Sequence, residues 1–116
     1  MRVLMPLALI AAPALADTPV IEHVEAMRLA TGWRFDVTVR HADAGWEHHA
    51  DGWTILTEAG EPLGHRELLH PHDDEQPFTR SLSGVGIPAG TERVILRAHD
   101  NVHGWSVGYE VVLPEE

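Results

Sequence analysis

Histidines are concentrated in three short stretches of the sequence. The stretches HADAGWEHHADGW (41–53), LLHPHDDEQPF (68–78) and AHDNVHGW (98–105) hold seven of the nine histidines in the chain. Neutral imidazole is the commonest protein ligand for zinc, and it also binds copper and nickel. Acidic residues in the same stretches could complete a coordination sphere or orient an imidazole from behind. These stretches therefore predict a site for a divalent transition metal.

Six histidines are the predicted ligands. His48 and His49 are adjacent, so in extended backbone they point in opposite directions and only one is expected to face the site. Pro71 restricts the backbone between two histidines that can lie on the same side. In decreasing order of preference, the predicted ligands are His70, His72, His48, His103, His41 and His99. The sequence leaves open whether the site includes His49, Asp43, Glu47, Asp73, Asp74 or Glu75.

The lack of cysteine narrows the choice of metal. No cysteine occurs in the chain, which excludes disulfides and thiolate ligands, and Met27 is the only methionine after residue 16. Soft Cu(I) is therefore not expected. Copper(II), zinc or nickel would suit the imidazoles, whereas calcium would use the hard oxygen atoms of the acidic run 73–75.

The first sixteen residues, MRVLMPLALIAAPALA, are typical of a secretory signal peptide. Arg2 precedes about a dozen apolar residues, and Ala14 and Ala16 form the small-x-small pattern found before a cleavage site. A membrane-spanning helix needs about 20 apolar residues, and this run ends at Asp17. We therefore expect cleavage before Asp17, a periplasmic location without membrane insertion after cleavage, and a single β-sandwich domain over 17–116.

The acidic composition excludes some partners. Eighteen acidic residues outnumber eight basic ones, none of them lysine, and removal of Arg2 with the leader takes the formal net charge from −10 to −11. Nucleic acids and anionic membranes recruit basic patches, so neither is an expected partner. An acidic surface suits cations, although it also serves solubility. The expected partners are a metal ion and a periplasmic protein.

Alternation of apolar and polar residues predicts an all-β fold. The clearest strand is 33–40, where Trp33, Phe35, Val37 and Val39 face one way. Seven short strands in about 100 residues fit a seven-stranded immunoglobulin-like or fibronectin-III-like sandwich, with Trp53 in its core. The other six strands are expected at about 20–29, 52–58, 63–70, 77–83, 91–99 and 106–113.

Such a sandwich would bring the histidine-rich stretches together. Connections between consecutive strands alternate between its two ends, so those after the second, fourth and sixth strands share one end. These connections are expected at about 41–52, 70–77 and 99–105. His23 and His65 fall within strands instead. The sequence therefore predicts one histidine cluster built from three loops that are distant in sequence.

Two other functions remain open from the residues around the histidines. All four tryptophans follow glycine, and Trp46 and Trp105 fall in the histidine-rich loops. They could form the rim of a protein- or glycan-binding adaptor module, or they could plug the end of the sandwich. Thr79, Ser81 and Ser83 lie near the histidines and would suit a hydrolase, including a metal-dependent one. No nucleophile-elbow motif accompanies them, so a hydrolase ranks third, after a metal-binding protein and an adaptor module.

The segments GWEHHADGW, LLHPHDDEQPFTRSL and AHDNVHGW together resemble an uncharacterised family of small exported proteobacterial proteins. The resemblance covers most of the chain after residue 16. It implies a shared exported domain built around these loops. No catalytic or binding role of any residue follows from it.

Overall fold

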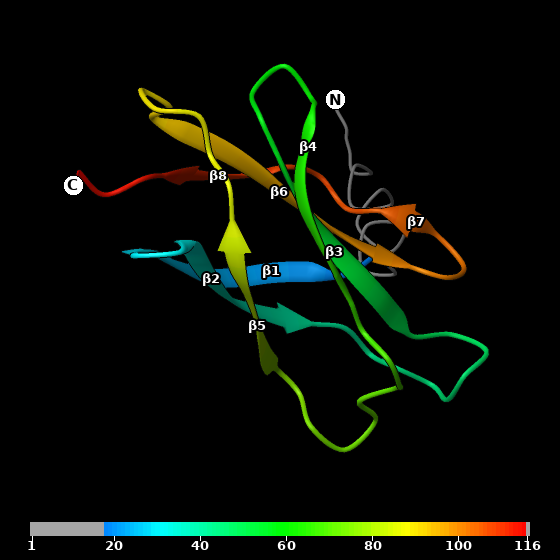
Figure 1. Ribbon diagram of the computed structural model, residues 1–116. Coiled ribbons are helices and arrows are strands. Elements are labelled where there is room, and N and C mark those ends of the chain that lie inside the picture. The colour runs from blue at the N-terminus through cyan, green and yellow to red at the C-terminus, as the bar shows by residue number, and fades with distance from the viewer. Residues whose placement is uncertain (1–17, 116) are drawn as a thin grey trace, which may run out of the picture.

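Two antiparallel β-sheets pack face to face in the computed structural model, which describes residues 18–115 (Figure 1). One sheet has the order β1-β2-β5, with β1 (Val20–Leu29), β2 (Gly32–Arg40) and β5 (Phe78–Val85). The other has the order β4-β3-β6-β7, with β8 also paired to β6. Its strands are β3 (Ala50–Leu56), β4 (Pro62–Glu67), β6 (Arg93–Asp100), β7 (Gly104–Trp105) and β8 (Tyr109–Val112). The predicted all-β fold is confirmed, and the two sheets form a sandwich.

The expected leader is not part of this description. The predicted signal peptide, residues 1–16, and its cleavage site before Asp17 lie outside the described residues. Within residues 18–115, no helix is long and apolar enough to cross a membrane.

The core lies between the sheets and uses the inward-facing residues of β2, β3 and β6. On β2 the predicted inward face is buried, with exposed fractions of 5% for Trp33 and 0% for Phe35. Trp53 of β3 is fully buried, as expected. Each large apolar side chain removed from water stabilises the fold by roughly 1.5–3 kcal/mol. These strands also bury Val37, Val39, Ala50, Ile55, Val94, Leu96 and Ala98 completely.

The fourth strand lies beside the third. β4 pairs antiparallel with β3, with Arg66 opposite Trp53. In a constant-type immunoglobulin domain the fourth strand instead joins the sheet of the first, second and fifth. The order observed here differs from that arrangement. As a result, the connection from β4 to β5 crosses from one sheet to the other at the histidine-rich end.

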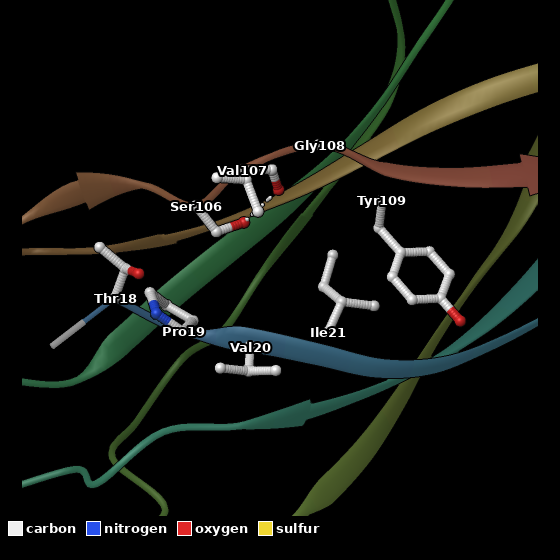
Figure 2. A pocket seen from close by; sticks show the side chains of 8 residues that line it. All are labelled: Thr18, Pro19, Val20, Ile21, Ser106, Val107, Gly108 and Tyr109. Carbon is white, nitrogen blue, oxygen red and sulfur yellow. Dashed lines mark hydrogen bonds between the residues drawn. The ribbon is translucent and has the colours of Figure 1, made fainter. Parts of the chain in front are cut away.

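Within the last predicted strand, 106–113, only β8 is formed, and residues 106–108 connect it to β7. Ser106 replaces the regular pairing, because its N–H donates to the Ala98 carbonyl at 2.7 Å and its hydroxyl accepts the Ala98 N–H at 3.0 Å. Val107 points outward and is 77% exposed, although it shares the phase of buried Val111. Figure 2 shows a mostly apolar pocket of about 210 Å³ between this segment and the start of β1. Its lining contains no histidine or carboxylate, so the coordinating chemistry lies elsewhere.

Close packing explains the glycine that precedes Trp53. A Cβ atom on Gly52 would lie 2.9 Å from the His65 ring and 3.2 Å from the Arg66 carbonyl oxygen. We therefore expect Gly52→Ala to lower the free energy of unfolding by about 1–3 kcal/mol, because overpacking displaces the neighbouring strand. Gly86→Ala is the matched control, since no atom lies within 4 Å of its Cβ position. Equal urea-unfolding midpoints for the two variants would contradict this expectation.

Candidate metal centre

The three histidine-rich connections meet at one end of the sandwich, toward the lower right of Figure 1. Gln76 links the first to the second: its Oε1 accepts the His41 N–H at 2.8 Å, and its Nε2 donates to the His72 carbonyl at 2.9 Å. Asn101 links the first to the third, because its Oδ1 accepts the His49 N–H at 2.9 Å. The three loops therefore lie side by side at this end of the sandwich. We call these connections the first, second and third loops, residues 41–49, 68–77 and 101–103.

Asp100, the last residue of β6, lies at the centre of the cluster. Its side chain is 0% exposed. Its Oδ1 accepts the backbone N–H groups of Val102 at 3.0 Å and Gly104 at 3.2 Å, and also that of His103. Gly104 can close this turn because its φ of +88° is in the left-handed region that favours glycine. The backbone of the third loop thus fixes the carboxylate and leaves Oδ2 for the histidines.

Three imidazoles face Oδ2 of Asp100. The distances are 2.9 Å from His41 Nε2, 3.1 Å from His48 Nε2 and 3.1 Å from His103 Nδ1. The ring centroids of His41 and His48, and of His48 and His103, are both 4.9 Å apart. A carboxylate oxygen offers about two lone-pair positions, so three N–H groups would compete for it. A shared cation would satisfy the ligand atoms of His41, His48 and Asp100 together.

His41 is held between two carboxylates. Its Nδ1 lies 2.6 Å from Asp43 Oδ1, on the side opposite the Asp100 contact, and the His41 and Asp43 side chains are 1% and 0% exposed. An ionised carboxylate only accepts, so both ring nitrogens of His41 face acceptors here. With a metal bound at Nε2, Nδ1 would donate to Asp43 and Nε2 would present its lone pair to the ion. Carboxylate–imidazole–metal chains of this kind are common, because the carboxylate fixes the ring and makes the imidazole a stronger ligand.

The spacing of the atoms suits a transition metal. Ligand atoms of His41, His48 and Asp100 all lie within 4.8 Å of one another. In a tetrahedral site with metal–ligand bonds of about 2.0–2.1 Å, neighbouring ligand atoms are about 3.3–3.4 Å apart. The two imidazole–carboxylate distances of 2.9 and 3.1 Å are slightly shorter than this. A small outward movement of the rings would therefore admit an ion.

The balance of charge also favours a cation. Within residues 18–115, neither Asp43 nor Asp100 has an arginine within 4.0 Å, and histidines are their only ionisable partners. Buried carboxylates are costly unless they are paired. The side chains of His48 and His103 are 29% and 31% exposed, so one side of the cluster meets solvent. This His/Asp group could therefore bind a metal ion that arrives from solution.

His70 and His72, the first two predicted ligands, form a separate pair beside this cluster. Their ring centroids are 4.7 Å apart, and the His72 ring stacks on Phe78 at 3.9 Å. Asp43 connects the pair to the cluster, because its Oδ2 accepts the His72 N–H at 2.7 Å. The His72 Nδ1 lies 3.9 Å from the same oxygen. The second loop thus comes close to the cluster without placing its imidazoles on Asp100.

His99 lies on the other face of its sheet. It precedes Asp100 on β6, and successive strand residues point to opposite faces. Its Nδ1 is 2.6 Å from Asp51 Oδ1, and its ring is 4.6 Å from that of Trp105. The structure does not bring His99 to the cluster, in contrast to the expectation from sequence.

The residues that the sequence left open are also placed. His49 turns toward Trp46, with ring centroids 5.6 Å apart, so only His48 of the adjacent pair faces Asp100, as expected. Glu75 pairs with Arg80 at 3.2 Å. Three further acidic residues that the sequence left open are exposed: Glu47, Asp73 and Asp74.

Asp100 is the member of the cluster that is absent from the ligands predicted from the sequence. The alternation of β6 predicts that its side chain faces inward, because Val94, Leu96 and Ala98 are buried at every second position. Asp100 continues that phase, so an acidic side chain had to point inward at the end of the strand. A buried acidic residue beside a histidine-rich loop is an indication of coordination chemistry.

Acid should destabilise the fold in two pH ranges. Burial lowers the pKa of His72 below its usual 6.5, and Arg80 and His70 add to the effect, so protonation favours the unfolded chain. Stability should fall as the pH drops below about 6.5. Burial alone would raise the pKa of Asp100, but hydrogen bonds from His103, His48 and His41 outweigh it and hold the pKa well below 3.8. A further loss should follow below about pH 3.8, toward that lowered pKa.

Urea unfolding of the metal-free protein from pH 7.5 to 3 measures both losses. His72→Gln should remove most of the pH dependence between 7 and 5, because glutamine does not titrate. A free energy of unfolding that stays constant from pH 7.5 to 5 in the unmodified protein would contradict the first step.

Comparison with known proteins gives one relative and no family. No protein-family model matches the chain, and no solved structure matches it. A protein of the archaeon Halomicrobium mukohataei that bears the name "Putative lipoprotein" is 45% identical over 82 residues. These residues are 71% of the chain and 39% of that protein, so the chain spans about two fifths of the relative's length. The similarity therefore extends to an archaeal protein, and the relative's name mentions no metal.

Proposed function

We propose that this protein binds a divalent transition metal at the cluster of His41, His48, His103 and Asp100. One observation carries the proposal: a buried carboxylate oxygen faces three imidazole nitrogens, from two loops, at 2.9–3.1 Å. The other oxygen of Asp100 is already occupied by backbone N–H groups. Oδ2 and the three imidazoles would therefore supply up to four ligands, the number preferred by zinc in closed sites.

Copper(II), zinc and nickel(II) are the proposed ions. Three imidazoles with one carboxylate match the ligand preference of these metals, whereas calcium and magnesium prefer oxygen ligands alone. The partial exposure of His48 and His103 supports exchange of the ion with solution or with a protein partner. Metal trafficking, buffering or sensing would use such exchange.

Asp43 would act as a positioning residue. Its Oδ1 holds His41 and also accepts the Ala50 N–H at 3.1 Å, and its Oδ2 holds the backbone of His72. This one side chain therefore ties the first loop to the start of β3 and to the second loop. The orientation of the His41 ring would depend on it.

The location of the protein is part of the proposal. The leader pattern of residues 1–16 and the name of the archaeal relative both support an exported protein, and we propose the periplasm for this chain. We also propose one sandwich domain over residues 17–116. Its strand order, with β4 beside β3, supports a fibronectin-III-like type more than a constant-type immunoglobulin one.

A second candidate function is a protein- or glycan-binding adaptor. It is favoured by the exposure of Trp46 and Trp105, which are 65% and 48% exposed at the histidine-rich end. Exposed aromatic rings are frequent at recognition surfaces. One double variant distinguishes the two functions: Trp46→Ala with Trp105→Ala would abolish adaptor binding and leave the metal affinity of the Asp100 cluster unchanged.

Metal analysis of the protein, isolated from the periplasm without an affinity tag, tests the proposed function. We expect bound copper, zinc or nickel, and a loss of that metal below about pH 6 as protons compete for the imidazoles. The double variant His48→Ala/His103→Ala should lose the metal of this cluster. The double variant His23→Ala/His65→Ala, which removes two strand histidines on exposed residues, should retain it. Failure of any divalent metal to bind at neutral pH would reject the proposal and favour the adaptor.

A further inference from the structure

The pair His70–His72 lies at an open pocket of about 570 Å³ beside the cluster. Trp46 of the first loop also lines it. The acidic run of the second loop contributes the rest, which gives the pocket a negative potential that attracts cations. The residues of this run in the lining are Asp73, Asp74 and Glu75.

His72 is buried without hydrogen bonds to its ring. It is 5% exposed, and neither Nδ1 nor Nε2 has a hydrogen-bond partner. Buried polar side-chain atoms nearly always have a partner, so an imidazole with two unpartnered nitrogens requires an explanation. Stacking on Phe78, at 3.9 Å between centroids and 9° between planes, holds the ring in place and offers no partner to its nitrogens.

His70 supplies a second imidazole with a fixed tautomer. Its Nδ1 lies 3.0 Å from the Pro71 carbonyl oxygen, which can only accept, so Nδ1 carries the proton. In a neutral ring Nε2 then keeps its lone pair, the form that binds a metal. The His70 residue is exposed and its ring lies against that of His72, so it is the half of the pair that can turn.

We propose that His70 and His72 form a second binding site for a divalent transition-metal cation. His72 would be the fixed ligand, His70 the mobile one, and the acidic side chains of the pocket or water would complete the coordination. The ligand set is softer in character than an all-oxygen site, so zinc(II) and copper(II) fit it better than calcium. This site shares no ligand with the Asp100 cluster, and it stands or falls independently of the proposed function.

Asp43 lies between the two sites and contacts both of them. Its Oδ1 contacts His41 of the cluster, and its Oδ2 lies 3.9 Å from Nδ1 of His72. The two sites would therefore lie on either side of one carboxylate group. Because the two sites share no ligand, the proposal predicts two bound ions per chain.

Calorimetric titration of the untagged full chain with zinc(II) at pH 7.5 tests this inference. We expect two equivalents in the unmodified protein, one in His70→Ala and one in His48→Ala/His103→Ala. His70 is exposed, so its replacement should leave the circular dichroism spectrum unchanged. His72→Gln should lose the same equivalent as His70→Ala, because it removes the imidazole. The loop should stay in place, since the variant keeps the backbone N–H that donates to Asp43. His23→Ala is the control and should bind two equivalents.

Each other outcome also decides the question. One equivalent that survives His70→Ala and disappears in His48→Ala/His103→Ala overturns the second site and leaves the proposed function standing. One equivalent with the opposite dependence supports the second site and overturns the proposed function. A single equivalent abolished by either replacement means one shared site and overturns the inference. Absence of binding overturns both.

Discussion

Asp100→Asn should lower the affinity for zinc(II) at the cluster by at least about 100-fold, which is the upper end of the loss caused by removing an outer-shell partner. Asparagine keeps one carbonyl oxygen for the backbone N–H groups of the third loop, so the turn can still form. Its amide group would replace Oδ2, however, and would direct N–H donors at the three imidazoles. The variant therefore removes an anionic ligand and leaves the surrounding chain in place.

Asp51→Asn is the matched control for this substitution. Asp51 also contacts a histidine, with 2.6 Å between its Oδ1 and His99 Nδ1, but it lies away from the cluster. Its replacement should leave zinc affinity within about twofold, while circular dichroism confirms the fold of both variants. Unchanged zinc binding in folded Asp100→Asn would remove this carboxylate from the site, and with it the geometry on which the proposed function rests.

Zinc(II) at a free concentration 100 times its dissociation constant should stabilise the protein by about 2.7 kcal/mol, because the ion binds the folded state and not the separated loops. For a domain of about 100 residues, this corresponds to a rise in the unfolding midpoint of roughly 10–20 °C. Differential scanning calorimetry measures it directly.

A chelator should reverse the rise completely, and calcium or magnesium at the same concentration should produce none of it. The double variant His48→Ala/His103→Ala should lose the stabilisation that belongs to the cluster, whereas His23→Ala/His65→Ala should retain all of it. A midpoint that does not move with saturating zinc would show that the ion does not bind the folded cluster.

Most of the framework could be predicted from the sequence. The alternation in β2 placed Trp33 and Phe35 in the core, because neighbouring strand residues point to opposite sides and only one side is dry. The regular spacing of turns predicted a sandwich, and the alternation of connections predicted that the three loops share one end. His41 continues the inward phase of β2 and is 4% exposed.

The tertiary structure alone decided how the histidines are grouped. Local spacing ranked His70 and His72 first, yet the crossing from β4 to β5 places them on the far side of Asp43. His99 stayed outside the cluster because it lies one residue from Asp100 on a strand, and a shift of one residue reverses the face.

The carboxylate at the centre shows the physical limit of sequence reasoning here. Strand periodicity determines that Asp100 points inward, but it does not determine which side chains it meets. His103 lies three residues after Asp100 and meets it within the local turn. His41 and His48 reach its Oδ2 only because the first loop folds over the same end of the sandwich. Contacts between segments so distant in sequence depend on the packing of the two sheets, which is a property of the whole chain.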